Sequence, residues 1–163
     1  MQIPAGALAA LHSDINAILA ACKQHDTASS AESGSSNKLA TLTQALALLA
    51  NSSRKPAEPG LLSGIMIEII ASVSSAISQD LEKMIPGRPW RVLLLNHSIV
   101  ATRCHDTELM EAAFAVLCEK LPEDATRFFS EGMEQMNVLD YPPHVRKVME
   151  KYHREWPVNP SLH

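Results

Sequence analysis

Residues 61–85 constrain the fold of this chain more than any other segment, because apolar side chains recur in them every three or four positions. This spacing follows the 3.6-residue turn of an α-helix and not the two-residue alternation of a half-buried strand. The apolar face is broad, which predicts a central helix contacted by several others. Proline cannot continue the helical hydrogen-bond ladder, so PGRP at 86–89 should end this helix. The apolar positions are Leu62, Ile65, Met66, Ile69, Ile70, Val73, Ala76, Ile77, Leu81, Met84 and Ile85.

The same segment raises the question of a membrane span. Residues 61–79 contain a single charged side chain, that of Glu68, but they also contain five serines. A spanning helix needs about 20 predominantly apolar residues. We therefore predict a buried helix of a soluble domain and no membrane span.

Other segments of the chain also carry helical patterns. Apolar residues make up 46% of the sequence but aromatic residues only 4%, so Ala, Leu, Ile and Met dominate. Most of these are strong helix formers, which favours an all-α fold. The apolar run VLLL near residue 93 would also suit a buried strand, but a lone strand leaves its backbone groups unpaired, so a helix is preferred there. The predicted helices besides 61–85 are 5–25, 38–51, 90–102, 107–120, 122–139 and 143–156.

The connections between these helices predict how the chain is organised. Two prolines and a glycine in RKPAEPG make a break between an N-terminal helical hairpin and the remaining helices. The hairpin is too small for a core of its own, so we predict one domain, a helical bundle or irregular α-array of about six to seven helices. Its parts are the hairpin at 1–53, a linker at 54–60, the main helical core at 61–156 and an irregular tail at 157–163.

Charge and cysteine content narrow the class of protein. The net charge of −4 argues against a dedicated nucleic-acid binder, which usually presents a basic face. Residues 107–140 are acidic, with a net charge of −6, and residues 141–163 are basic, with a net charge of +2. Three cysteines without a CxxC pair do not form a disulfide framework, and the first residues lack the basic start of a secretory signal. We expect a cytoplasmic protein.

The stretch NHSIVATRCHD at 96–106 gathers the densest set of candidate ligands: His97, Cys104, His105 and Asp106. In one continuous helix, a single stripe would contain His97, Cys104, His105 and Glu108 and could hold a metal ion. Asp106, however, precedes TELMEAAF and is a good N-cap for the following helix. We interpret the stretch first as a helix end and cap, and second as a ligand or metal site. The sequence identifies neither the metal nor a cofactor.

Cys104 has a second functional interpretation. A thiol just before a helix N-terminus, beside Arg103 and His105, can have a lowered pKa and act as a reactive or redox-sensing group. The alternative is a small, partly buried apolar residue. We prefer this alternative, because most thiols of this kind are inert.

Two further features suggest a binding surface. Met133 and Met136 in EGMEQM could line an adaptable surface, although methionine usually fills a core. The C-terminal segment combines an apolar stripe, cationic residues and aromatic residues, which are frequent in protein interfaces. That helix could dock into a partner or close this chain's own core, with Trp156 as its final plug. The candidate interaction residues are Tyr141, His144, Arg146, Tyr152, Arg154 and Trp156.

Motifs for catalysis are absent from the sequence, which has no glycine-rich phosphate loop, no GxSxG and no HExxH. The leading hypothesis is therefore a small cytoplasmic helical interaction protein, an accessory subunit or adaptor that binds a protein partner or forms a homodimer. The alternative is a ligand- or metal-binding sensor or small enzyme with a site near His97, Cys104 and His105. A helical transcription regulator is a weaker third hypothesis, because no basic recognition helix is visible.

Overall fold

The computed structural model describes residues 39–46, 48, 57–73, 78–79 and 83–157. Within these ranges the protein is all-helical and contains no strand, as the periodicity predicts. The first arm of the expected hairpin, at 5–25, lies outside the described residues, as does most of the expected tail. The second arm is helical over 39–46, where Leu39, Leu42 and Leu46 are buried.

Helix α3 spans Ala57–Ser72 and therefore begins inside the segment expected to be a linker. The reason is that Pro59 falls in the first helical turn. Backbone N–H groups there have no acceptor within the helix, so a proline without an N–H breaks no hydrogen bond. At its other end the helix stops at Ser72, whose hydroxyl donates to the carbonyl oxygen of Glu68 at 2.7 Å. The prediction of one helix reaching residue 85 is wrong in its last turn, since Met84 lies in a turn and is 94% exposed.

Helix α5 spans Pro89–Arg103, which decides between helix and strand for this segment in favour of helix. Pro89 occupies the first turn and so begins this helix. Helices α6 (Thr107–Lys120), α7 (Pro122–Val138) and α8 (Pro143–Glu155) match the predicted segments to within one residue. None of the described helices is long and apolar enough to cross a membrane.

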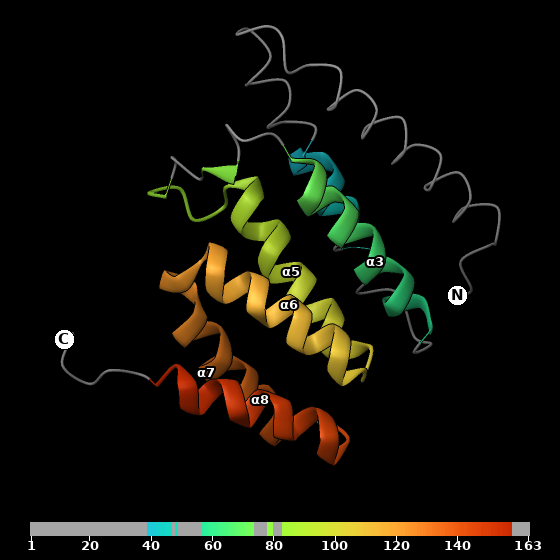
Figure 1. Ribbon diagram of the computed structural model, residues 1–163, viewed down its shortest axis with the longest axis vertical. Helices are drawn as coiled ribbons and strands as arrows, with labels where there is room; N and C mark the ends of the chain where they lie inside the picture. Colours follow the sequence, from blue (N-terminus) through green and yellow to red (C-terminus); the bar gives the residue numbers. More distant parts are fainter. Residues whose placement is uncertain (1–38, 47, 49–56, 74–77, 80–82, 158–163) are drawn as a thin grey trace, which may run out of the picture.

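The helices pack in a fixed order. Helix α5 lies between α3 and α6, and α6 in turn packs against α7 and α8, as Figure 1 shows. Phe114 of α6 is fully buried where the last three helices meet, and its ring makes edge contacts with Phe128, Phe129 and Tyr152 at centroid distances of 5.7, 5.2 and 5.1 Å. A few aromatic rings thus supply a large part of the core volume at this junction.

Two arginines at the start of α5 bind the start of α7. The guanidinium of Arg91 binds the Asp124 carboxylate through two nitrogens, with Nε 2.8 Å from Oδ2, and both side chains are mostly buried. Arg88 is almost fully buried, and its Nη2 lies 3.5 Å from Oε1 of Glu123. The bidentate Arg91–Asp124 pair fixes orientation as well as contributing energy. The two arginine–carboxylate pairs join the start of α5 directly to the start of α7, and α6 packs against both helices.

Candidate functional site

Asp106 caps helix α6, as the sequence predicts. Its Oδ1 accepts hydrogen bonds from the backbone N–H groups of Glu108 at 2.9 Å and Leu109 at 3.2 Å. A carboxylate at this position satisfies free N–H groups and complements the positive end of the helix dipole. The structural interpretation of NHSIVATRCHD is confirmed for this residue.

His105 makes the sharp corner between α5 and α6. Its φ of 57° places it in the left-handed region, which residues other than glycine rarely adopt. The exposed ring makes an edge contact with the ring of Tyr141 at 5.6 Å, and the His105 carbonyl oxygen accepts a hydrogen bond from Nε2 of His144 at 3.0 Å. The corner is therefore tied to the α7–α8 connection and to the first turn of α8.

His97 lies elsewhere, in the interface between α5 and α3. The side chain is buried, and its Nε2 is 3.3 Å from Oγ of Ser63 on α3. Its Nδ1 has no hydrogen-bond partner among the described residues. Burial disfavours the charged ring and lowers the pKa of His97 to about 4, so the imidazole is neutral at pH 7.

Cys104 does not have the environment of an activated thiol. Its Sγ lies 3.2 Å from the Val100 carbonyl oxygen, to which it donates one helical turn back. Burial and then the Asp106 charge raise the pKa of Cys104 to about 11, and the nearby Arg103 only partly opposes them. Burial also raises the pKa of Cys118 to about 11. Both pKa values move opposite to the direction that a reactive cysteine requires.

These positions give no support to a shared metal centre. In the described part of the chain, no three histidine, cysteine, aspartate or glutamate side chains gather in a way that could hold a metal ion. His97 bonds to Ser63 of α3, whereas His105 contacts Tyr141 in the connection between α7 and α8. The structure brings His105 and Asp106 together at the corner, but the buried His97 serves a different interface.

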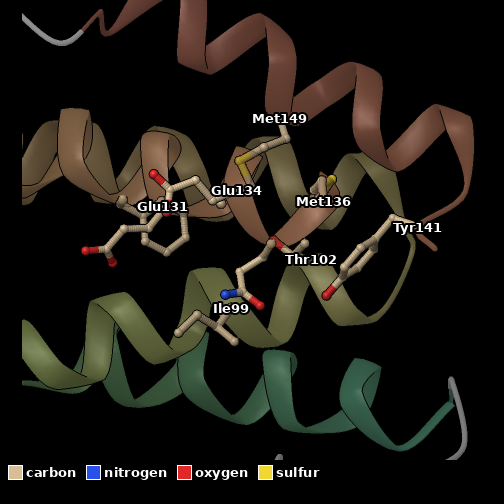
Figure 2. Close-up of a pocket in the computed structure, with 10 residues that line it drawn as sticks. Ile99, Thr102, Glu131, Glu134, Met136, Tyr141 and Met149 are labelled. Atoms are coloured by element: carbon tan, nitrogen blue, oxygen red, sulfur yellow. The ribbon is translucent and has the colours of Figure 1, made fainter. Parts of the chain in front are cut away.

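A cleft lies between α5, α7 and α8, and sequence reasoning missed it. Its volume is about 430 Å³. As Figure 2 shows, the lining combines Ile99 and Thr102 of α5 with Glu131 and Glu134 of α7, while Tyr141 lies at one end. The lining residues are Ile99, Thr102, Phe128, Glu131, Gly132, Glu134, Gln135, Met136, Tyr141 and Met149.

Apolar side chains form most of this lining, and the charged groups lie towards solvent. Met136 and Met149 are buried, whereas Glu131 and Glu134 are exposed. The only signals in the sequence were the methionines of EGMEQM, of which Met136 lines the cleft and Met133 packs on the core. Lining residues from three helices and a connection cannot be grouped without knowing how those helices pack.

The predicted interaction residues of the C-terminal segment divide between several roles. Tyr141 lines the cleft, and His144 bonds to the corner. Tyr152 and Trp156 pack against this chain's own core. Arg146 binds Glu150, the Met136 carbonyl oxygen and Oδ1 of Asn137 at 2.8–2.9 Å, which fixes the end of α7 on α8.

Arg154 remains on the exposed side of α8, where its Nε donates to the Glu150 carbonyl oxygen at 3.3 Å. The six predicted residues therefore differ in what they contact within the domain.

Comparison of the chain with protein-family models, with curated proteins and with solved structures finds no match. What the site can do is therefore argued from its own residues.

Proposed function

We propose that this protein is a small helical interaction protein, an accessory subunit or adaptor, which binds a partner protein by accepting its apolar side chains into the cleft between α5, α7 and α8. The cleft itself is the observation that carries the proposal. Its volume of about 430 Å³ can take one or two large side chains, and its methionines can adapt to their shape.

The surface around the cleft favours a macromolecule over a small molecule. Ile99 stands at the rim and is 45% exposed. Val138 and Leu139 follow the cleft-lining residues of α7 at its C-terminal end, and both are exposed. Exposed apolar groups beside a pocket extend the contact area beyond what the pocket alone would bury. Such an arrangement suits the face of a partner helix.

The chemistry of the lining favours binding over catalysis. Among the cleft-lining residues there is no histidine, cysteine or lysine, and the two carboxylates are exposed. The alternative hypothesis, a sensor or small enzyme at His97, Cys104 and His105, receives less support because His97 is neutral and buried and Cys104 is a protonated thiol at pH 7.

A homodimer in the cytoplasm is a second form of the same proposal. Leu61 and Ile67 lie on the exposed side of α3, and Ile67 is 42% exposed. An exposed apolar face of this kind could pair two copies of the chain about a two-fold axis.

Two matched variants distinguish partner binding in the cleft from homodimer formation through α3. Ile99→Glu and Ile67→Glu place the same charge at two similarly exposed isoleucines, one at the cleft and one on α3. The tagged full-length variants and the wild type would be isolated gently from their native cells, and bound proteins would be quantified by native mass spectrometry. A partner retained by Ile67→Glu and lost with Ile99→Glu supports the cleft. A second copy lost only with Ile67→Glu assigns the contact to α3, and equal retention by both variants contradicts the cleft proposal.

A further inference from the structure

The charged residues that line the cleft are both acidic. Glu131 and Glu134 lie one turn apart on α7, and no lysine, arginine or histidine is part of the lining. Figure 2 shows both carboxylate-bearing side chains on the α7 side of the opening, across from Ile99. A partner would therefore meet an apolar floor with negative charge along one wall.

The other carboxylates of α7 have structural partners. Glu123 and Asp124 are held by Arg88 and Arg91 of α5, at the far end of the helix from Met136. Their charges are neutralised within the domain. Glu131 and Glu134 are the carboxylates of α7 that line the cleft and that a partner there would meet.

The carboxylates of Glu131 and Glu134 make only weak ionic interactions within the domain. Glu131 pairs with Arg127 at 2.6 Å, but both side chains are more than half exposed, and such surface pairs contribute little. Glu134 is exposed and forms no ion pair with another residue in the described part of the chain. A cation from a partner could replace Arg127 beside Glu131, and a second cation could pair with Glu134.

The positive charge of Arg146, near the cleft, is bonded to groups of this same domain. Arg146 of α8 is bound to Glu150, to Asn137 and to the carbonyl oxygen of Met136. Its guanidinium is therefore unavailable to cancel the charge of Glu131 or Glu134.

Resting on the proposed function, we infer that the partner segment is a basic amphipathic helix that places a bulky apolar side chain in the cleft and lysine or arginine residues against Glu131 and Glu134. The two carboxylates are three positions apart on α7, so cations one turn apart on a helix can meet them together. Complementary charge of this kind selects the partner and speeds its association.

A peptide selection tests the charge separately from the cleft. Random peptides of about 16 residues, enough for four helical turns, would be displayed and selected on the full-length wild type, with counter-selection on Ile99→Glu. The inference expects enriched peptides with a large apolar residue flanked by lysine or arginine. Glu134→Lys should weaken a selected peptide roughly fivefold, since one exposed ion pair has about that effect. The control Glu119→Lys, an exposed glutamate on α6 outside the cleft, should leave its affinity unchanged.

The possible outcomes separate the two proposals. Cleft-dependent peptides that are neutral or acidic, or equal effects of Glu134→Lys and Glu119→Lys, would overturn the inference about charge and leave cleft docking in place. If no peptide distinguishes the wild type from Ile99→Glu, both the inference and the cleft proposal are overturned.

Discussion

The side chain of Met149 on α8 lies directly against the bare backbone of Gly132 on α7. A Cβ atom at Gly132 would be 2.8 Å from both Sδ and Cε of this methionine. Glycine within a helix is unfavourable by about 1 kcal/mol relative to alanine, so this position gives up helix stability to admit Met149. The same contact sets the inner wall of the cleft, because both residues line it.

Gly132→Ala should therefore alter the cleft more than the stability of the fold. The new methyl group must displace Met149, whose flexible side chain can move, and the gain in helix propensity of about 1 kcal/mol offsets part of the lost packing. We expect the free energy of unfolding, measured in urea, to change by less than about 1 kcal/mol. The Met149 methyl resonance in NMR spectra should shift, and partner binding should weaken.

Gly64→Ala is the matched control. Gly64 lies in α3, and a Cβ atom there would meet nothing within 4 Å. This variant should gain about 0.5–1 kcal/mol of stability and leave the Met149 resonance in place. Equal stabilisation by both alanines would contradict the close contact between Gly132 and Met149.

Much of the fold could be predicted from local patterns. The spacing of apolar residues, Pro122 and Pro143 at helix starts and the Asp106 cap place α6, α7 and α8 to within one residue. The end of α3 could not be predicted in the same way. The apolar period continues past Ser72 to Met84, yet the helix stops, and the hydroxyl of Ser72 bonds back to the chain at that point.

The candidate site was predictable only in part. Asp106 was identified as a cap because capping depends on a few adjacent residues. For Cys104, the sequence alone left open a lowered pKa beside the preferred interpretation of a partly buried thiol. The pKa is raised, because burial, which depends on tertiary packing, outweighs the charge of Arg103. The cleft was missed because Ile99, Gly132 and Met149 come from three helices, and no pattern along the chain links them.

Cys104 should react slowly with alkylating reagents. With a pKa of about 11 instead of the ordinary 9.0, its thiolate fraction at pH 8 is roughly one hundredth of that of a free cysteine. Peptide mapping by mass spectrometry after timed iodoacetamide treatment would follow each cysteine separately. The rate at Cys104 should rise about tenfold for each pH unit between 8 and 10, and it should rise about a hundredfold in urea at pH 8, where unfolding restores the ordinary pKa. Rapid native labelling at pH 7 would revive the reactive-thiol hypothesis.

The Arg91–Asp124 pair should contribute measurably to stability. Its side chains are 20% and 12% exposed, and the guanidinium also donates to the Pro86 carbonyl oxygen at 2.8 Å. A double-mutant cycle with Arg91→Ala and Asp124→Ala should give a coupling energy of about 1–2 kcal/mol in urea unfolding. The exposed Arg127–Glu131 pair is the control, with an expected coupling below about 0.5 kcal/mol. Equal coupling in the two pairs would mean that burial does not strengthen the first.

His97 should make the domain less stable in mild acid. Its pKa is lowered to about 4 in the folded protein from an ordinary 6.5, so the unfolded chain binds more protons between these two pH values. The contribution of the neutral His97 to the free energy of unfolding is therefore fully present above pH 6.5 and is lost as the pH falls towards 4. The loss from this residue between pH 7 and pH 4 should be about 3 kcal/mol, because one pKa unit corresponds to about 1.4 kcal/mol.

His97→Gln isolates this effect, since an amide can still bond to Ser63 but does not titrate. Urea unfolding of both proteins at pH 7 and pH 4 should show that the wild type loses about 3 kcal/mol more than the variant. The other acid-sensitive groups are common to both proteins and cancel in the comparison. Because His97 joins α3 to α5 through Ser63, the excess loss should appear first as faster amide hydrogen exchange in these two helices. Parallel losses in wild type and variant would show that His97 is not held neutral by burial.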